Sequence, residues 1–413
     1  GPASEYQQQI AYADDSTFSS GQAGTAQQPE PDIIPSTRRN APRRSTVAAT
    51  VQGEDKATAD TAAPPAEEPP KTRVLDWPDA TERLDRAYGY PYSRPPSSYL
   101  FIGGEAWTFD NAAWTGPGCL PELFVTNTTT GNTLRADEAA VFFGGVGLPD
   151  PGTLMPVLAL GSNASPVQLA RKYGDWGHAI PVLQCVLAGW DVVYAAHVSF
   201  YGSATAMLAP CPGAAVEVAL LLLDENQAAA MDATEGGHDL CCMTGVDLHV
   251  ARSLDQVESG QTNAGEMEDQ VVLAYLHSNG ALTLPPEEDA PATPIAVAAV
   301  RASGRTFPAL TQDAMLCAIN RMCSIADSSS MSSVQQAMCS SRCADCSIDG
   351  SPRDEDLDLW VLSVTDSKPM KSSVNKVVKT AAQKKSDKRV VPAYASSWFI
   401  SGGSNGKRSG NRK

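Results

Sequence analysis

Apolar residues follow a regular pattern only in the middle of the chain, from Leu154 to about Ser324. Within this segment they form short, nearly continuous runs bounded by turn-forming residues, a pattern typical of strands that are buried on both faces. The runs that predict these strands are Leu154–Leu160, Val192–Phe200, Ala214–Leu223, Thr244–Ala251 and Val271–Ser278.

Turn and capping signals separate the predicted strands. Pro210-Cys211-Pro212-Gly213 predicts a turn before the third strand, and Asn279-Gly280 predicts a tight hairpin into Ala281–Leu284. Capping boxes predict two helices, and an apolar stripe predicts a third over 311–325. The capping pairs are Ser165 with Gln168 and Asp224 with Gln227. Strands outnumber helices and their order is mixed, which favours an α+β fold with a mixed sheet or barrel and helices outside it.

The segments on either side of this middle part, 151–325, differ from it in composition. Residues 1–73 are rich in Gln, Pro, Ala and Thr and lack apolar periodicity, so we expect them to be disordered. Residues 74–150 are rich in aromatic side chains and predict an ordered extension that packs on the core. Residues 326–413 are Ser- and Cys-rich and then Lys-rich, so we expect them to be largely disordered, with local order around Leu357–Val364 and Tyr394–Ile400. Strands are predicted in the extension at Ser98–Ile102, Glu122–Asn127 and Ala139–Phe143.

Charge and cysteine content narrow the class of protein. The net charge is −16, and the basic residues are concentrated after residue 367, so the body should repel nucleic acid and we expect no specific nucleic-acid partner. No apolar run approaches the roughly 18 residues of a membrane span, and no secretion signal is visible, so we expect no membrane association. Ten cysteines are too few for a disulfide scaffold in a chain of 413 residues, which favours free thiols and a cytoplasmic location.

Two local features suggest chemistry. The loop Gly161–Ala164 follows a predicted strand and leads into a capped helix, so its backbone N–H groups and the positive helix end favour a carboxylate or phosphate. Its spacing matches neither a dinucleotide-binding loop nor a phosphate-binding P-loop. Glu235 lies at the end of a predicted short helix, where the helix dipole disfavours an acid, so a compensating group is expected nearby.

Together these features resemble the γ-glutamylcyclotransferase-like family. That family has a Tyr-Gly-Ser-Asn-Leu loop after its first strand, and VLALGSNASPVQLARKY matches it at Gly161, Ser162 and Asn163. The later run WDVVYAAHVSFYGSATAMLAPCPGAAVEVALLLLDENQAAAMDATEGG is similar to the family's Ala-Thr strand, Pro-Gly turn and acidic segment. The matched positions there are Ala204-Thr205, Pro212-Gly213, Met231-Asp232 and Glu235-Gly236. The resemblance covers about 157–284 and implies a γ-glutamylcyclotransferase-like mixed β-barrel or sheet with peripheral helices for 151–325.

The resemblance also implies an activity. In this family a γ-glutamyl amine or peptide cyclises by attack of its own α-amine on the γ-carbonyl, which releases 5-oxoproline and frees the amine. The resemblance implies that Glu235 is the acid/base and that the loop Leu160, Gly161, Ser162, Asn163 and Ala164 holds the substrate carboxylate. It implies neither a cofactor nor a metal. A base that works near neutrality is expected to have a raised pKa, so we expect Glu235 to be partly buried.

Several positions depart from the family pattern and leave an alternative open. Leu160 replaces the leading tyrosine of the loop, and Ala164 replaces its last leucine. Leu240, Cys241 and Cys242 stand where an aromatic residue is usual, and Val216-Glu217-Val218 replaces the V-x-G of a family strand, so the small residue is missing. The alternative is therefore an inactive member of the fold that acts as a binding or scaffold protein, with a protein partner docking through the termini.

Other candidate ligands are the cysteines and histidines. Cys339, Cys343 and Cys346 have the spacing of an iron–sulfur triplet but lack a following barrel, so zinc binding, a redox cluster and no function all stay open. The histidines show no metal-binding spacing. His238, three residues after Glu235, is a candidate for the same pocket, with no role in the site as the favoured alternative. His197, His249 and His277 lie in predicted strands and are expected to be structural.

Overall fold

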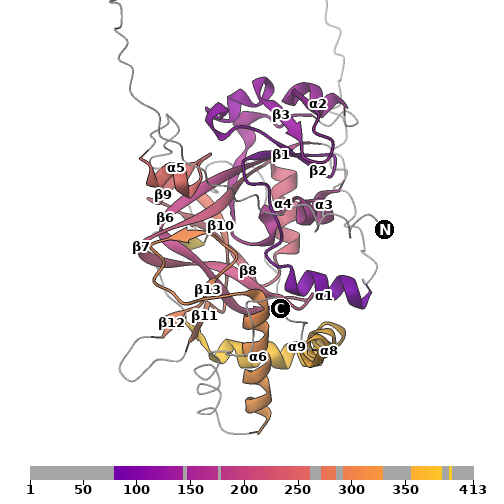
Figure 1. Cartoon of the computed structure of the whole chain (residues 1–413), viewed down its shortest axis with the longest axis vertical. Coiled ribbons are helices and arrows are strands. Elements are labelled where there is room, and N and C mark those ends of the chain that lie inside the picture. Colours follow the sequence, from indigo (N-terminus) through magenta and orange to yellow (C-terminus); the bar gives the residue numbers. More distant parts are fainter. Residues whose placement is uncertain are drawn as a thin grey trace, which may run out of the picture. The chain divides into compact units, whose positions relative to one another are not determined.

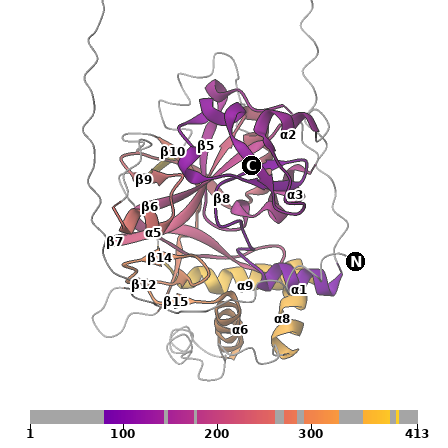
Figure 2. The ribbon, with the colours of Figure 1, turned by 45° about the horizontal axis from the view of Figure 1, so that its top comes forward.

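A large, mostly antiparallel sheet with helices around it forms a mixed α+β fold (Figures 1 and 2). The computed structural model describes residues 79–142, 147–174, 178–260, 271–284, 292–328, 355–383 and 390–392. All of them belong to one unit, which spans 68–413. Within the described residues, no helix is both long enough and apolar enough to cross a membrane.

The two longest strands, β6 (Ile180–Val198) and β7 (Ala204–Leu223), form an antiparallel hairpin. β6 covers the predicted strand Val192–Phe200 up to Val198, and β7 contains the predicted strand Ala214–Leu223; each observed strand is about twice as long as predicted. Nearly every side chain along both strands is buried, which agrees with their continuous apolar sequence.

The remaining strands attach to this hairpin. The free edge of β6 pairs in turn with β1 (Tyr99–Ile102), β9 (Asp247–Val250), β13 (Ala296–Val297) and β11 (Ala281–Leu284). The edge of β7 pairs with β5 (Met155–Ala159) and β14 (Ala302–Ser303). Beyond β5 the order continues with β10 (Val272–His277), β8 (His238–Met243) and β17 (Val390–Pro392). The pair β5–β10 is parallel, whereas these other pairs are antiparallel.

Two predicted turns have a different structure from the one expected. The segment Pro210-Cys211-Pro212-Gly213 lies inside β7, where the register with β6 shifts. A proline cannot donate to the ladder, and Gly213 has φ +85°, so the strand bulges and then resumes instead of turning back. At Asn279-Gly280 the chain does turn, but β10 pairs with β5 and β8, while β11 pairs with β6, β12 (Thr293–Pro294) and β16 (Ala382–Gln383).

The N-terminal part of the described chain is built into the same sheet. It contains α1 (Ala80–Tyr88), β2 (Glu105–Thr108), β3 (Phe124–Asn127), β4 (Thr133–Arg135) and α2 (Ala136–Phe142). The strands predicted at 98–102 and 122–127 are confirmed as β1 and β3, but the strand predicted at 139–143 is wrong, because α2 occupies it. Asp137 and Glu138 in its first turn favour a helix start, and the alanines that follow favour a helix.

Helices α3 (Pro166–Tyr173), α4 (Glu225–Thr234) and α5 (Leu254–Glu258) lie beside the sheet. The predicted capping box of α4 is confirmed, with Asp224 accepting from the Gln227 N–H and the Gln227 side chain accepting from the Asp224 N–H. The capping box predicted for α3 is wrong. Ser165 is the N-cap residue, but its hydroxyl donates to the Ser93 carbonyl at 2.7 Å, so the extension takes the group that would have capped the helix.

Three helices pack together at one end of the sheet in both views: α6 (Gln312–Ser328), α8 (Glu355–Asp366) and α9 (Lys368–Thr380) (Figures 1 and 2). The first confirms the helix predicted over 311–325. The other two lie within 326–413, which was expected to be largely disordered; α8 confirms the order expected near Leu357–Val364, and α9 was not predicted. The Asn375 side chain bonds the N–H and carbonyl of Val198, which fixes α9 on the end of β6. The expected order at Tyr394–Ile400 lies outside the described residues.

Short elements complete the described chain. They are β15 (Ala309–Leu310), which pairs with β13, and 3-10 turns at Asn111–Ala113, Pro117–Glu122, Pro151–Thr153 and Ser162–Ala164.

A buried ion pair links β6 to the segment before β15. Asp191 of β6 is fully buried and forms a two-point ion pair with Arg305, at 2.8 Å to Nε and 2.9 Å to Nη2.

We predict that Asp191→Asn lowers the free energy of unfolding by about 3–5 kcal/mol, because it leaves the mostly buried guanidinium of Arg305 without its counter-charge. Urea unfolding at pH 7 measures the loss. Asp255→Asn is the matched control, because Asp255 forms an equally close pair with Arg301 at the surface and its loss should change stability little. Equal losses in the two variants would contradict the prediction.

Candidate active site around Glu235

The fold brings Glu235 to the loop that follows β5. Strand β7 ends beside Met155, at the start of β5. Helix α4 then runs for ten residues, about 15 Å, which matches the length of the five residues of β5. Glu235, the C-cap residue of α4, therefore reaches the end of β5, where Asn163 Nδ2 donates to its Oε1 at 2.9 Å. The two predicted site segments, 72 residues apart in sequence, meet at this hydrogen bond.

Lys172 is the compensating group that the position of Glu235 requires. It lies in the last turn of α3, and its Nζ is 2.6 Å from Glu235 Oε1. The Lys172 side chain is 6% exposed and that of Glu235 is 14% exposed, so both charges are largely removed from water. No motif in the sequence predicts this role for Lys172. The unfavourable place of an acid at a helix C-terminus was the available signal, but it did not identify the partner.

The expectation of a raised pKa for Glu235 is wrong. Burial pushes its pKa upward, but the charge and hydrogen bond of Lys172 and the amide of Asn163 outweigh burial, so the pKa is lowered. The carboxylate is consequently ionised at neutral pH. Only Oε1 carries these two contacts, and Oε2 lies 3.8 Å from His238 Nδ1, too far for a hydrogen bond.

Three histidines form a cluster beside Glu235. His197 of β6 stacks on His277 of β10, with ring centroids 4.5 Å apart, and His238 of β8 meets His277 edge-on at 4.8 Å. Burial, followed by the neighbouring imidazoles, lowers the pKa of His197 to about 4 and that of His277 to about 3, so both rings are neutral at pH 7. His238 therefore lies beside Glu235, which was the less favoured of the two alternatives, and it is joined by two histidines that were expected to be only structural.

The predicted substrate-binding loop is divided between two environments. Asn163 faces Glu235, and Ser162 lies beside Tyr201. On the other side, Leu160, Gly161 and Ala164 line a cavity of about 170 Å³ whose lining does not include Glu235.

Tyr90, from the N-terminal extension, covers Gly161. A Cβ added to Gly161 would lie 2.0 Å from the Tyr90 hydroxyl, so only glycine fits beneath this ring. The Tyr90 hydroxyl accepts a hydrogen bond from the Ala206 N–H at 2.8 Å, which fixes the ring on β7. Tyr90 therefore covers one face of Gly161, a residue of the predicted carboxylate-binding loop.

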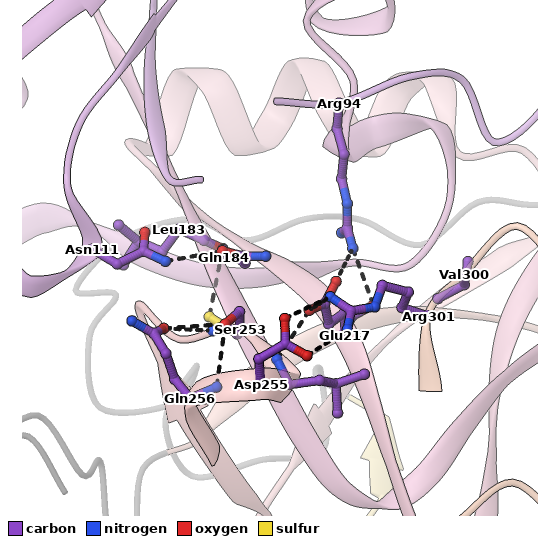
Figure 3. A network of polar contacts seen from close by, with 12 residues as sticks. Arg94, Asn111, Leu183, Gln184, Glu217, Ser253, Asp255, Gln256, Val300 and Arg301 are labelled. Carbon is purple, nitrogen blue, oxygen red and sulfur yellow. Dashed lines mark hydrogen bonds and ion pairs between the residues drawn. The ribbon is translucent and has the colours of Figure 1, made fainter. Parts of the chain in front are cut away.

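A second buried polar centre surrounds Glu217 of β7 (Figure 3). Glu217 Oε1 accepts from the Leu254 N–H at 3.0 Å and from Arg301 at 3.3 Å, and Arg94 approaches Oε2 at 3.6 Å. These contacts account for an acidic side chain inside a largely buried strand. A larger hollow of about 490 Å³ lies near Phe124, Gln184 and Gln256, and neither Glu235 nor Arg94 lines it.

Metal ligands and known relatives add no further assignment. Within the described residues, no group of three His, Cys, Asp or Glu side chains is placed to hold a metal ion. Cys339, Cys343 and Cys346 lie outside the described residues, whereas Cys119, Cys185, Cys211 and Cys241 are free thiols. No protein-family model, curated protein or solved structure matches the chain.

We predict that Lys172→Met destabilises the fold in a pH-dependent way. At pH 7 the loss should be about 3–5 kcal/mol, because an ionised carboxylate is left buried without its partner. The wild-type pair contributes stability above the unfolded-state pKa of Glu235 and loses it as pH falls through the lowered folded-state pKa. In the variant burial raises that pKa, so the difference in stability should shrink as pH falls toward about 4.

Urea unfolding at pH 7, 5 and 4 measures this difference. The double variant Lys172→Met/Glu235→Gln is the control, since it removes both charges and should lose the pH dependence. A Lys172→Met penalty that is the same at all three pH values would show that Glu235 does not depend on Lys172 for its charge.

Proposed function

We propose that this chain is a γ-glutamylcyclotransferase-like enzyme that releases 5-oxoproline, or a related lactam, from a γ-glutamyl amine or peptide. The observation that carries the proposal is the hydrogen bond between Asn163 and Glu235. It joins the two segments on which the family resemblance depends, and it places the carboxylate in a largely buried position beside the loop and not in bulk water.

Glu235 would work as a base that is already ionised. Its Oε2 takes a proton from the substrate α-ammonium, and the freed amine nitrogen attacks the γ-carbonyl carbon to form the ring C–N bond. The bond from that carbon to the leaving nitrogen breaks as Glu235 returns the proton to that nitrogen. The ring nitrogen then gives its remaining extra proton to Glu235, which passes it to the released amine, so the lactam N–H and an ammonium are the products. A lowered pKa makes proton uptake harder and proton return easier. Because the attack is intramolecular, most of the catalysis is positioning.

The position of Tyr90 restricts where the substrate can lie. Because its hydroxyl covers Gly161, we place the substrate on the side of the loop formed by Ser162 and Asn163, next to Glu235. The implied cradle of five loop residues is therefore reduced in this proposal to Ser162 and Asn163, of which Asn163 contacts the acid. The reaction as proposed uses no cofactor and no metal, and we assign it to the cytoplasm.

A second candidate is a binding or scaffold protein that keeps the fold without turnover. Two observations favour it: Tyr90 occupies the surface of Gly161, and Lys172 neutralises the only carboxylate assigned a catalytic role. In this case a protein partner would dock through the terminal segments, and the Glu235–Lys172 pair would have only a structural role.

We predict that Glu235→Gln lowers 5-oxoproline release from γ-glutamyl amines, dipeptides and glutathione by a factor of about 10² or more, because the amide keeps the shape of the side chain but cannot accept the proton. Chromatographic detection of 5-oxoproline measures the release. Asp232→Asn is the matched control, since Asp232 is an exposed acid three residues earlier and should leave the rate unchanged.

Folding of each variant is checked by urea unfolding, because Glu235→Gln also removes an ion pair. Release by the wild type that survives in Glu235→Gln would assign the chemistry to another residue. No release from any of these substrates by folded wild-type protein would favour the binding protein.

A further inference from the structure

Arg94 stands at the wall of the cavity of about 170 Å³ that adjoins Gly161. Three segments line this cavity: the extension at 91–94, the loop residues Leu160, Gly161 and Ala164, and Ala299-Val300. Arg94 is the only charged residue among them. Glu235 and Asn163 do not line it, so the cavity is separate from the candidate active site.

The guanidinium of Arg94 is poorly paired for its surroundings. Among the described residues its polar contacts run from one nitrogen, Nη2, to the Glu217 carbonyl at 3.5 Å and to Glu217 Oε2 at 3.6 Å. Both are longer than a normal charge-assisted hydrogen bond of about 2.7–2.9 Å. Glu217 meanwhile holds Leu254 and Arg301 more closely through Oε1 (Figure 3).

Burial makes this weak pairing costly. The Arg94 side chain is 27% exposed, and burial lowers its pKa despite the nearby charge of Glu217. A guanidinium carries five N–H donors in a planar fork that fits a carboxylate with two hydrogen bonds. Arg94 therefore has donors to spare at the edge of a cavity.

The rest of the lining is apolar or already hydrogen-bonded. Leu160, Ala164 and Val300 are buried apolar side chains. The Tyr92 hydroxyl donates to the Arg86 carbonyl, and the Ser93 carbonyl accepts from Ser165. One cation in such a wall suits a single negative charge attached to an apolar body, whereas phosphate would need more positive charge.

The size of the cavity sets the size of the occupant. A protein cavity of about 150 Å³ can hold benzene, so about 170 Å³ accepts a body of about that size. We propose that this cavity binds a small monocarboxylate with a compact apolar body, whose carboxylate receives two hydrogen bonds from Arg94. This site is independent of the proposed turnover at Glu235.

Ligand-observed NMR titration of the full chain with isobutyrate and with benzoate tests the proposal. The wild type should bind at least one of them saturably, and benzamide, the neutral analogue, should not compete. Arg94→Gln should weaken binding by about tenfold or more, because the charged hydrogen bonds are lost. Arg301→Gln is the matched control: it removes another partner of Glu217 but does not line the cavity, so affinity should be unchanged.

Ala299→Leu provides a second test if Arg94→Gln does not fold. Ala299 is exposed and lines the cavity, so leucine should narrow it and weaken binding without changing any charge. The proposal is overturned if the wild type binds neither acid, if Arg94→Gln or Ala299→Leu binds as well as the wild type, or if phosphate binds more tightly than both acids. Affinity that falls in Glu235→Gln but not in Arg94→Gln would place the ligand at the other site and also overturn it.

Discussion

The antiparallel ladder between β6 and β7 determines where the other described segments can lie. The outer edge of β6 pairs with the N-terminal strand β1 and with the short strand β9, and the outer edge of β7 pairs with β5. Because β7 ends at the start of β5, the helix that follows it must run back along β5, and its last residue meets the loop beyond that strand. The contact between Glu235 and Asn163 is thus a consequence of strand pairing and of the matched lengths of α4 and β5.

Charges in this fold are buried next to an opposite charge. Lys172 accompanies Glu235, Arg305 accompanies Asp191, and Arg94 and Arg301 both approach Glu217. The first two pairs have short contacts, which suits groups that must stay ionised in a low-dielectric interior. Arg94 differs because its contacts are long and it faces a cavity, and this difference marks it as a binding group, not only a structural one.

The sequence predicted the parts of the fold that depend on local pattern. The strands at 155–159 and 272–277 and the capped helix α4 carry their own signals of apolarity and capping, and the structure contains them. Pro and Gly residues occur both in turns and in bulges, so the sequence predicts a turn where the structure has a bulge at Gly213. Only the pairing with the partner strand decides between the two. Likewise Ser165 has the spacing of a capping box, but a distant carbonyl, that of Ser93, takes its hydroxyl.

The candidate site was predictable only in part for the same reason. Glu235 and Asn163 could be found from a motif, whereas Tyr90 and Arg94 reach the loop from an extension that carries no motif. Lys172 lies in the helix after the matched loop, at a position that the motif does not specify. The sign of the Glu235 pKa shift depends on Lys172, so burial alone gave the wrong direction. The pairing of β1 with β6 brings in the extension, and periodicity within one segment cannot reveal such a long-range contact.

The pH dependence of 5-oxoproline release by the wild type tests the central claim most directly. If Lys172 keeps the carboxylate ionised, titration of the enzyme should not lower the rate between about pH 7 and pH 5. The rate should fall through protonation of Glu235 only below that range. Release that falls with an apparent pKa near 6–7, or no release at any pH from folded protein, would contradict the account of Glu235 as an ionised base.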